Sequence, residues 1–140
     1  MKIIKVGCAT DNGKELKKNH FGDAKFYDIY EISEENIEFC KRINNPKYEE
    51  DEEEEEGHSG NPEKAKGITK PLKKEGVKMM IGYQIGPNIV NMRKNFVPAV
   101  SRSLNIEKTL VNAQKIIKKV EEEWDNGENR KHIIIKEEES

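Results

Sequence analysis

The chain has 140 residues, of which 34% are hydrophobic and 37% are charged, so it suits one domain with its own core and is too short for two ordinary domains. The formal net charge is −2, and eight of the 27 acidic residues form one unbroken run, Glu49–Glu56. The positive charge is spread along the chain and is not clustered with aromatic residues, which argues against a nucleic-acid-binding protein.

The N-terminal third of the chain predicts three β-strands. Ile3–Thr10 is a short, mainly apolar run that ends at the turn signal Asp11–Gly13. Phe26–Ile32 and Ile37–Ile43 alternate between apolar and polar residues and are rich in aromatic and β-branched side chains. Ser33–Asn36 supplies a turn between them. The pattern therefore predicts one strand followed by a β-hairpin.

An acidic segment follows the hairpin. Asn44–Pro46 closes the hairpin, and the eight acids of the run repel one another and retain water, so residues 47–60 are predicted to form a flexible loop inserted in the domain. Order is predicted to return at Asn61 and Pro62, an N-cap followed by a proline at the first helical position. This predicted helix extends towards Glu75, and Pro71 interrupts it, so that either a kinked helix or two short helices are predicted there.

Two further strands are predicted in the second half. Val77–Ile81 is a short apolar run typical of a strand covered on both faces, and Phe96–Val100 is a similar run. Between them, Gly82–Asn88 is predicted to be a loop that feeds a short helix, with Pro87 in its first turn.

A single amphipathic helix is predicted over Ile106–Trp124, with Asn105 as its N-cap. Its apolar residues recur at steps of three and four, which places them on one face. Gly127 fits the left-handed position that ends a helix. Residues 1–127 form the predicted domain, and residues 128–140 form a tail in which Ile133–Ile135 is either an edge strand or disordered.

The order of these elements predicts the fold class. Three strands come first, and helices then separate the later strands, which favours an α/β fold with a mixed, five-stranded sheet and helices on both faces.

Several separated motifs, taken together, resemble a known family. Over about Ile3 to Glu123, the chain resembles the dinitrogenase iron-molybdenum cofactor biosynthesis family. This resemblance implies a three-layer α/β/α sandwich with a ribonuclease H-like motif, and it implies the role of a nitrogenase accessory factor that carries iron-sulfur cofactor precursors. The matching residues are His20, Phe21, Gly22, Asp23, Ala24, Asn45, Pro46, Gly82, Ile85, Gly86, Pro87 and Asn88.

The resemblance also implies ligands for that cargo. Carriers of the family use a histidine of the His-Phe-Gly motif, here His20, Phe21 and Gly22, and often a cysteine two residues after the glycine, where this chain has Ala24. An imidazole on a loop held by a rigid sheet suits soft or borderline metals, although a lone histidine is more often an ordinary surface residue. His20 is therefore the first candidate metal ligand.

Two weaker metal ligands are Cys8 and His58. Cys8 comes near the end of the first predicted strand, where open α/β sheets bind their ligands, but a cysteine on a strand is more often a small buried hydrophobe. His58 follows the acidic run in the predicted loop, from which it could approach His20. The chain has only two cysteines, so it cannot alone supply four thiolates to a cluster.

Gly86, Pro87 and Asn88 are a further candidate for cofactor binding. Free amides at the start of a short helix would face an anion such as a phosphate or the carboxylate or sulfide face of a cofactor. The simpler interpretation of these residues is a structural turn.

The leading hypothesis is a non-enzymatic carrier that transiently binds an iron-sulfur cluster or an iron-molybdenum cofactor precursor. The chain has no hydrolase, kinase or redox motif, and a nuclease would depend on Asp11, Asp23 and Asp28 as its only nearby carboxylates. The alternative is a metal-free regulatory or scaffold module that binds a protein partner or a small anion.

The partners and the compartment follow from these hypotheses. The carrier requires cofactor donor and acceptor proteins and would act as a monomer or a weak homodimer. No apolar stretch approaches the roughly 18 residues that span a bilayer, and the segment Met1–Lys5 starts no signal peptide, which predicts a cytoplasmic protein without a membrane partner.

Overall fold

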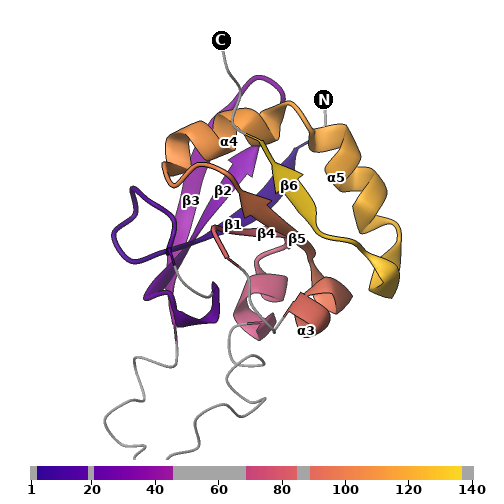
Figure 1. The fold of residues 1–140 in the computed structure, drawn as a ribbon, viewed down its shortest axis with the longest axis horizontal. Helices are drawn as coiled ribbons and strands as arrows, with labels where there is room; N and C mark the ends of the chain where they lie inside the picture. The colour runs from indigo at the N-terminus through magenta and orange to yellow at the C-terminus, as the bar shows by residue number, and fades with distance from the viewer. Residues whose placement is uncertain (1–2, 19–20, 46–68, 85–88, 137–140) are drawn as a thin grey trace, which may run out of the picture.

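A computed structural model describes residues 3–18, 21–45, 69–84 and 89–136, which form an α/β fold around one mixed sheet (Figure 1). The strand order is β3-β2-β1-β4-β5-β6. The β1–β2 and β2–β3 pairs are antiparallel, whereas the β1–β4, β4–β5 and β5–β6 pairs are parallel. The strands are β1 (Ile4–Thr10), β2 (Phe26–Ile32), β3 (Ile37–Asn44), β4 (Val77–Gly82), β5 (Val97–Ser101) and β6 (Ile133–Ile135).

Helical segments pack on both faces of this sheet. The helices α4 (Ile106–Gln114) and α5 (Ile117–Trp124) cover one face, and α3 (Ile89–Asn95) and the helical residues 69–74 cover the other. Two short 3-10 helices, η1 (Phe21–Asp23) and η3 (Gly127–Asn129), precede β2 and β6.

Two separate core clusters lie against the two faces. Along β1, side chains alternate between them, so Cys8 joins the cluster under α4 and α5 while Ala9 joins the cluster on the opposite face. Leu110 and Val120 come from the helices into the first cluster, and Leu72 lies in the second. The sheet thus separates two apolar cores.

The first strand, the hairpin and the buried strand are confirmed. In the hairpin turn, the Ser33 hydroxyl accepts hydrogen bonds from the backbone amides of Glu35 and Asn36, at 3.3 and 3.1 Å. In β4, both Met79 and Met80 are fully buried although they project to opposite faces, as expected for a strand covered on both sides.

The prediction of five strands is wrong, because the described residues already form six strands of the sheet. Ile133–Ile135 pairs in parallel with β5 and makes the edge strand β6, which decides between the two interpretations of that segment. Ile133 and Ile135 are buried in the core under α4 and α5, and this burial favours the strand. The α/β/α sandwich and the ribonuclease H-like motif stay predictions.

The prediction of one continuous helix over residues 106–124 is also wrong. The helix breaks at Lys115 and Ile116, whose amides donate to carbonyls three residues back, at 3.2 and 3.0 Å. Such bonds tighten the turn and reorient the axis. The apolar side chains before and after the break still face the same core, since Leu110 and Ile117 pack in one cluster. The predicted N-cap is confirmed, since the Asn105 side chain accepts a hydrogen bond from the Lys108 amide at 2.8 Å.

Other predictions fall partly outside the described residues. Pro71 lies within the helical residues 69–74, whereas the acidic loop 47–60 and the predicted helix start at Pro62 lie outside the described part of the chain. Pro87 also lies outside the described residues, and the predicted short helix is represented by α3, which begins at Ile89.

Candidate functional site

The site is built where the parallel strands β1 and β4 end. Neighbouring parallel strands bring their carboxyl ends to one edge of the sheet, which is the usual ligand-binding edge of open α/β folds. The loop of residues 11–18 leaves β1 there, and η1 follows it in the chain before β2 returns along β1.

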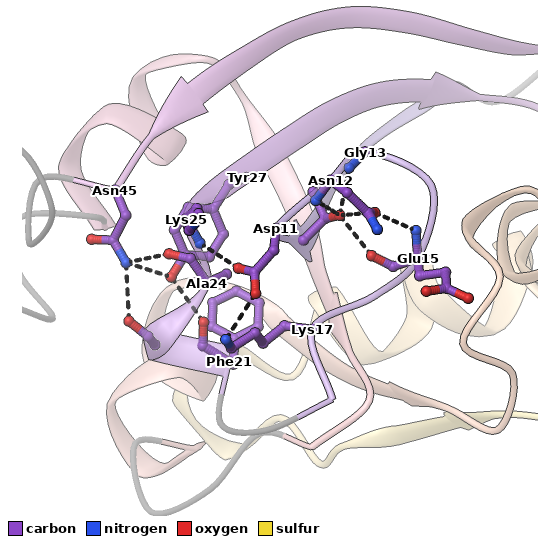
Figure 2. Close-up of polar contacts among 12 residues, drawn as sticks. Asp11, Asn12, Gly13, Glu15, Lys17, Phe21, Ala24, Lys25, Tyr27 and Asn45 are labelled. Carbon is purple, nitrogen blue, oxygen red and sulfur yellow. Dashed lines mark hydrogen bonds and ion pairs between the residues drawn. The ribbon is translucent and has the colours of Figure 1, made fainter.

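Side-chain hydrogen bonds fix the loop that leaves β1. The Thr10 hydroxyl donates to the Glu15 carbonyl at 2.6 Å and accepts from the Gly13 amide at 2.8 Å. The Asn12 side-chain oxygen accepts from the amides of Lys14 and Glu15, at 2.8 and 2.9 Å. Gly13 has φ of 82°, a value that favours glycine. The predicted turn is therefore confirmed and held by its own polar side chains (Figure 2).

Asp11 ties this loop to the start of β2. One carboxylate oxygen accepts from the Lys25 backbone amide at 2.9 Å, and the other pairs with the Lys17 ammonium at 2.8 Å. Partial burial raises the pKa of Asp11, but the hydrogen bonds from Lys17 and Lys25 and their charges outweigh it, so the pKa lies below its ordinary value. Asp11 is thus a charged brace between two segments of the site (Figure 2).

Asn45 holds the turn around η1 from the other side. Its side-chain amide is buried and donates to the carbonyls of Ala24 and Gly22, at 2.7 and 3.0 Å. The Tyr27 hydroxyl donates to the Phe21 carbonyl at 2.8 Å. As Figure 2 shows, residues from the end of β3 and from β2 therefore hold the backbone of Phe21–Ala24 in one conformation.

The Phe21 ring anchors the turn on the sheet. It is buried and lies 5.1 Å from the Tyr27 ring, centroid to centroid. A Cβ atom at Gly82, the last residue of β4, would lie 3.1 Å from the Phe21 ring. The absence of a side chain at Gly82 thus makes room for this ring. The contact joins the His-Phe-Gly motif to the motif that begins at Gly82.

Comparison with protein families matches residues 2–122 to the family described as dinitrogenase iron-molybdenum cofactor. The chain belongs to this family. The match covers most of the chain, confirms the resemblance, and links the protein to the handling of nitrogenase cofactors. No curated protein matches the chain. Within the described residues, no helix is long and apolar enough to cross a membrane.

The family motif has a structural role that the structure shows directly. Phe21 and Gly22 were predicted to contact the cofactor, and the structure makes them the anchor and the hydrogen-bonded centre of the turn. The predicted ligand His20 precedes Phe21 in the sequence and lies outside the described residues, as do His58 and the segment 86–88. Their proposed roles stay predictions.

Cys8 is placed away from this turn. It is fully buried in the cluster under α4 and α5, while Phe21 belongs to the cluster on the opposite face. Burial, and then the charge of Asp28, raise the pKa of the Cys8 thiol far above its ordinary value. A metal ligand must be a thiolate that the metal can reach, so the structure favours the buried hydrophobe for Cys8.

Two of the three carboxylates suggested for a nuclease, Asp11 and Asp28, are engaged in other contacts. Asp11 braces the loop, and Asp28 is buried and bound by the Arg42 guanidinium through two contacts of 2.8 and 3.1 Å. In the part of the chain that the structure describes, no three histidine, cysteine or acidic side chains are grouped to hold a metal ion.

An open pocket adjoins the braced loop. Its volume is about 260 Å³, and it lies between the loop after β1 and the segment before α4. The pocket combines ammonium groups, carboxylates and two leucines, so it offers polar contacts beside the loop after β1. The lining residues are Asp11, Asn12, Glu15, Leu16, Lys17, Lys18 and Leu104.

The sequence did not reveal the role of Asn45. It appeared as a residue that closes the hairpin, and its contacts with Gly22 and Ala24 span more than twenty positions. The one signal was its place in the family motif beside Pro46. Local turn chemistry cannot find a contact of this range.

Proposed function

We propose that the protein is a non-enzymatic carrier that transiently binds an iron-sulfur cluster or an iron-molybdenum cofactor precursor at the carboxyl edge of its sheet. The observation that carries this proposal is the turn Phe21–Ala24, which Asn45 and Tyr27 hold in place directly after His20 in the sequence. A fixed backbone beside a ligand limits the conformations that the ligand must lose on binding.

His20 is the first ligand in this proposal, and His58 is a weaker second one. A neutral imidazole binds soft or borderline metals and exchanges more readily than a closed set of thiolates. Two or three exchangeable ligands suit a cargo that a donor protein delivers and an acceptor protein removes. Cys8 has no part in this site, because it is buried on the opposite face of the sheet.

The charge around the turn also supports this cargo. Residues 11–25 carry four lysines and three acids, and Asp11 is already neutralised by Lys17. Sulfide-rich clusters and molybdenum-containing precursors are anions, so a surplus of ammonium groups favours their approach.

The family and the strand order support the finer fold. Helical segments on both faces and the order β3-β2-β1-β4-β5 are what an α/β/α sandwich with a ribonuclease H-like motif requires. The cytoplasm is the compartment that we propose for this exchange.

The test is uptake of cargo by the purified apoprotein. Under anaerobic conditions the protein is incubated with a cluster source, separated, and examined for visible absorption and for iron, molybdenum and sulfide per chain. We expect wild type to become coloured and His20→Ala to lose most of the bound metal. His132→Ala is the matched control, since His132 is exposed and lies beside β6.

Two results would refute the carrier. One is wild type that stays colourless with every cluster source, and this result would favour the metal-free scaffold. The other is equal uptake by His20→Ala and His132→Ala, which would show that the metal binds without the motif histidine.

A further inference from the structure

β3 is an exposed edge strand that mixes apolar and charged side chains. β3 has eight residues and borders the sheet, so only β2 pairs with it in the described part of the chain. Every side chain except Ile43 is exposed, including Phe39 at 53%. The Phe39 ring packs edge-on against Tyr30 at 5.5 Å. The unpaired backbone groups of such an edge can pair with another strand, and its charged side chains and bulge restrict which strand fits.

A bulge determines which face each side chain of β3 occupies. Phe39 pairs with Tyr30 and Lys41 pairs with Ile29, which leaves Cys40 as the extra residue. One face of β3, on the side of α4, therefore holds Ile37, Phe39, Arg42 and Asn44, and the other holds Glu38, Cys40, Lys41 and Ile43.

We propose that β3 pairs antiparallel with β3 of a second copy of this chain, about a two-fold axis between Cys40 and Lys41. Such an axis makes the two sheets continuous and requires residues opposite each other to share a face. All eight residues then find a partner on their own face. The pairs are Ile37 with Asn44, Glu38 with Ile43, Phe39 with Arg42, and Cys40 with Lys41.

The bulge excludes the neighbouring registers. A shift by one position sets Glu38 opposite Arg42 or Glu38 opposite Asn44, and each of these pairs joins residues of different faces. A shift by two positions sets Phe39 opposite Cys40, or Lys41 opposite Arg42, with the same conflict. The strand is thus complementary to itself over its full length in one register only.

The chemistry of this register is also favourable. No two like charges are directly opposite each other. The two Lys41 side chains flank the dyad on one face, where each ammonium already pairs with Glu75 of its own chain at 2.9 Å. The Phe39 ring faces the partner's Arg42, a guanidinium that Asp28 already holds at 2.8 Å. Glu38 is the diagonal neighbour of the partner's Lys41 on the same face, within reach of long side chains. Symmetry repeats each contact.

The size of the contact sets its strength. Stable interfaces bury at least about 1,200 Å², and one strand edge of eight residues provides less than this, so the dimer is weak and depends on concentration. The inference is independent of the proposed cargo, because it rests on β3 alone.

Sedimentation velocity of the apoprotein between about 1 µM and about 1 mM tests the dimer. We expect the dimer fraction of wild type to rise with concentration. Phe39→Lys sets an ammonium opposite the partner's Arg42 and should raise the dissociation constant at least about tenfold. The control Ile3→Glu changes an apolar side chain that is 58% exposed but lies outside β3, and it should leave the dimer unchanged.

A charge exchange tests the register. Glu38→Lys and Lys41→Glu should each weaken dimerisation, because each sets like charges on the diagonal, and the double variant should recover most of the wild-type association. Circular dichroism verifies that each variant is folded. If both single variants dimerise weakly and the double variant does not regain dimerisation, this register is refuted.

Cys40 provides a direct measurement of the dyad. In the proposed pairing the two Cys40 Cα atoms lie about 6 Å apart, from the strand spacing and the rise per residue. A short bismaleimide should therefore join two wild-type chains but not two Cys40→Ser chains, since Cys8 is buried. A wild type that dimerises without this cross-link refutes the dyad. A monomer at all concentrations, or a monomer that binds another protein through Phe39, refutes the proposal.

Discussion

The carboxyl edge of the sheet and the face under α4 and α5 are stabilised in different ways. At the edge, Thr10 and Asn45 each make two or more directed hydrogen bonds to loop backbone, and Asp11 makes one to the Lys25 amide and an ion pair with Lys17. Under the helices, apolar side chains such as Leu110 and Val120 pack without polar contacts of their own. Directed bonds fix a geometry, whereas apolar burial supplies most of the free energy of folding.

This difference separates stability from positioning. A substitution under α4 removes buried area and lowers the stability of the whole domain, but the folded molecules keep the turn Phe21–Ala24 intact. A substitution at the edge costs less stability and changes the conformation beside His20. Predictions for the two regions therefore differ in kind as well as in size.

Leu110→Ala has the largest expected effect. Leu110 is 1% exposed in the core under α4, and leucine-to-alanine changes in such cores cost about 3 kcal/mol, within a range of about 2–5 kcal/mol. Urea unfolding followed by circular dichroism measures this loss. Cargo uptake per folded molecule should equal that of wild type, and reduced uptake would contradict the separation of the two regions.

Asn45→Ala should cost about 2 kcal/mol, because it leaves the buried carbonyl of Ala24 and the partly buried carbonyl of Gly22 without their side-chain donor. It should also lower cargo uptake by folded molecules, since the turn after His20 loses its support. Asn44→Ala is the matched control, because Asn44 is exposed and should change neither quantity. A stable Asn45→Ala variant with full uptake would remove the turn from the proposed mechanism.

The local patterns of the sequence predicted the strands and the faces well. The hairpin, its Ser33 turn and the apolar face of residues 106–124 depend on neighbours within a few positions, and all are present. The break at Lys115 was missed because the apolar period continues across it. The sequence left Ile133–Ile135 undecided between a strand and disorder, because the strand forms only by pairing with β5, which is distant in the chain.

The candidate site was less predictable for the same reason. The turn at Asp11–Gly13 was visible, since its hydrogen bonds are local. The contact of Phe21 with Gly82 joins residues far apart in the chain, and no pattern in either segment indicates it. The burial of Cys8 likewise follows from packing by α4 and α5, which a strand pattern alone leaves undecided.

Gly82→Ala tests that long-range contact with a smaller effect. The added methyl group would lie 3.1 Å from the Phe21 ring, so the ring or β4 must shift, at a cost of about 1 kcal/mol. In urea unfolding, the double variant Gly82→Ala with Phe21→Leu should lose less stability than the sum of the two single losses, because the smaller side chain relieves the crowding. Additive losses would show that the two residues do not touch.

Asp11→Asn has the smallest expected effect, and pH shows its cause. The side chain of Asp11 is 36% exposed, so solvent screens the pair with Lys17 and the loss at pH 7 should stay below about 1 kcal/mol. Because folding lowers the pKa of Asp11, its contribution is complete above the unfolded value of about 3.9 and fades as pH falls through the lower folded value. The difference in urea midpoint between wild type and Asp11→Asn should therefore be constant from pH 7 to pH 5 and shrink below pH 4. It should also shrink with added salt at pH 7. If this difference in urea midpoint changed with neither pH nor salt, the charge of Asp11 would not contribute to stability. The side chain would then act only through its hydrogen bond with the Lys25 amide.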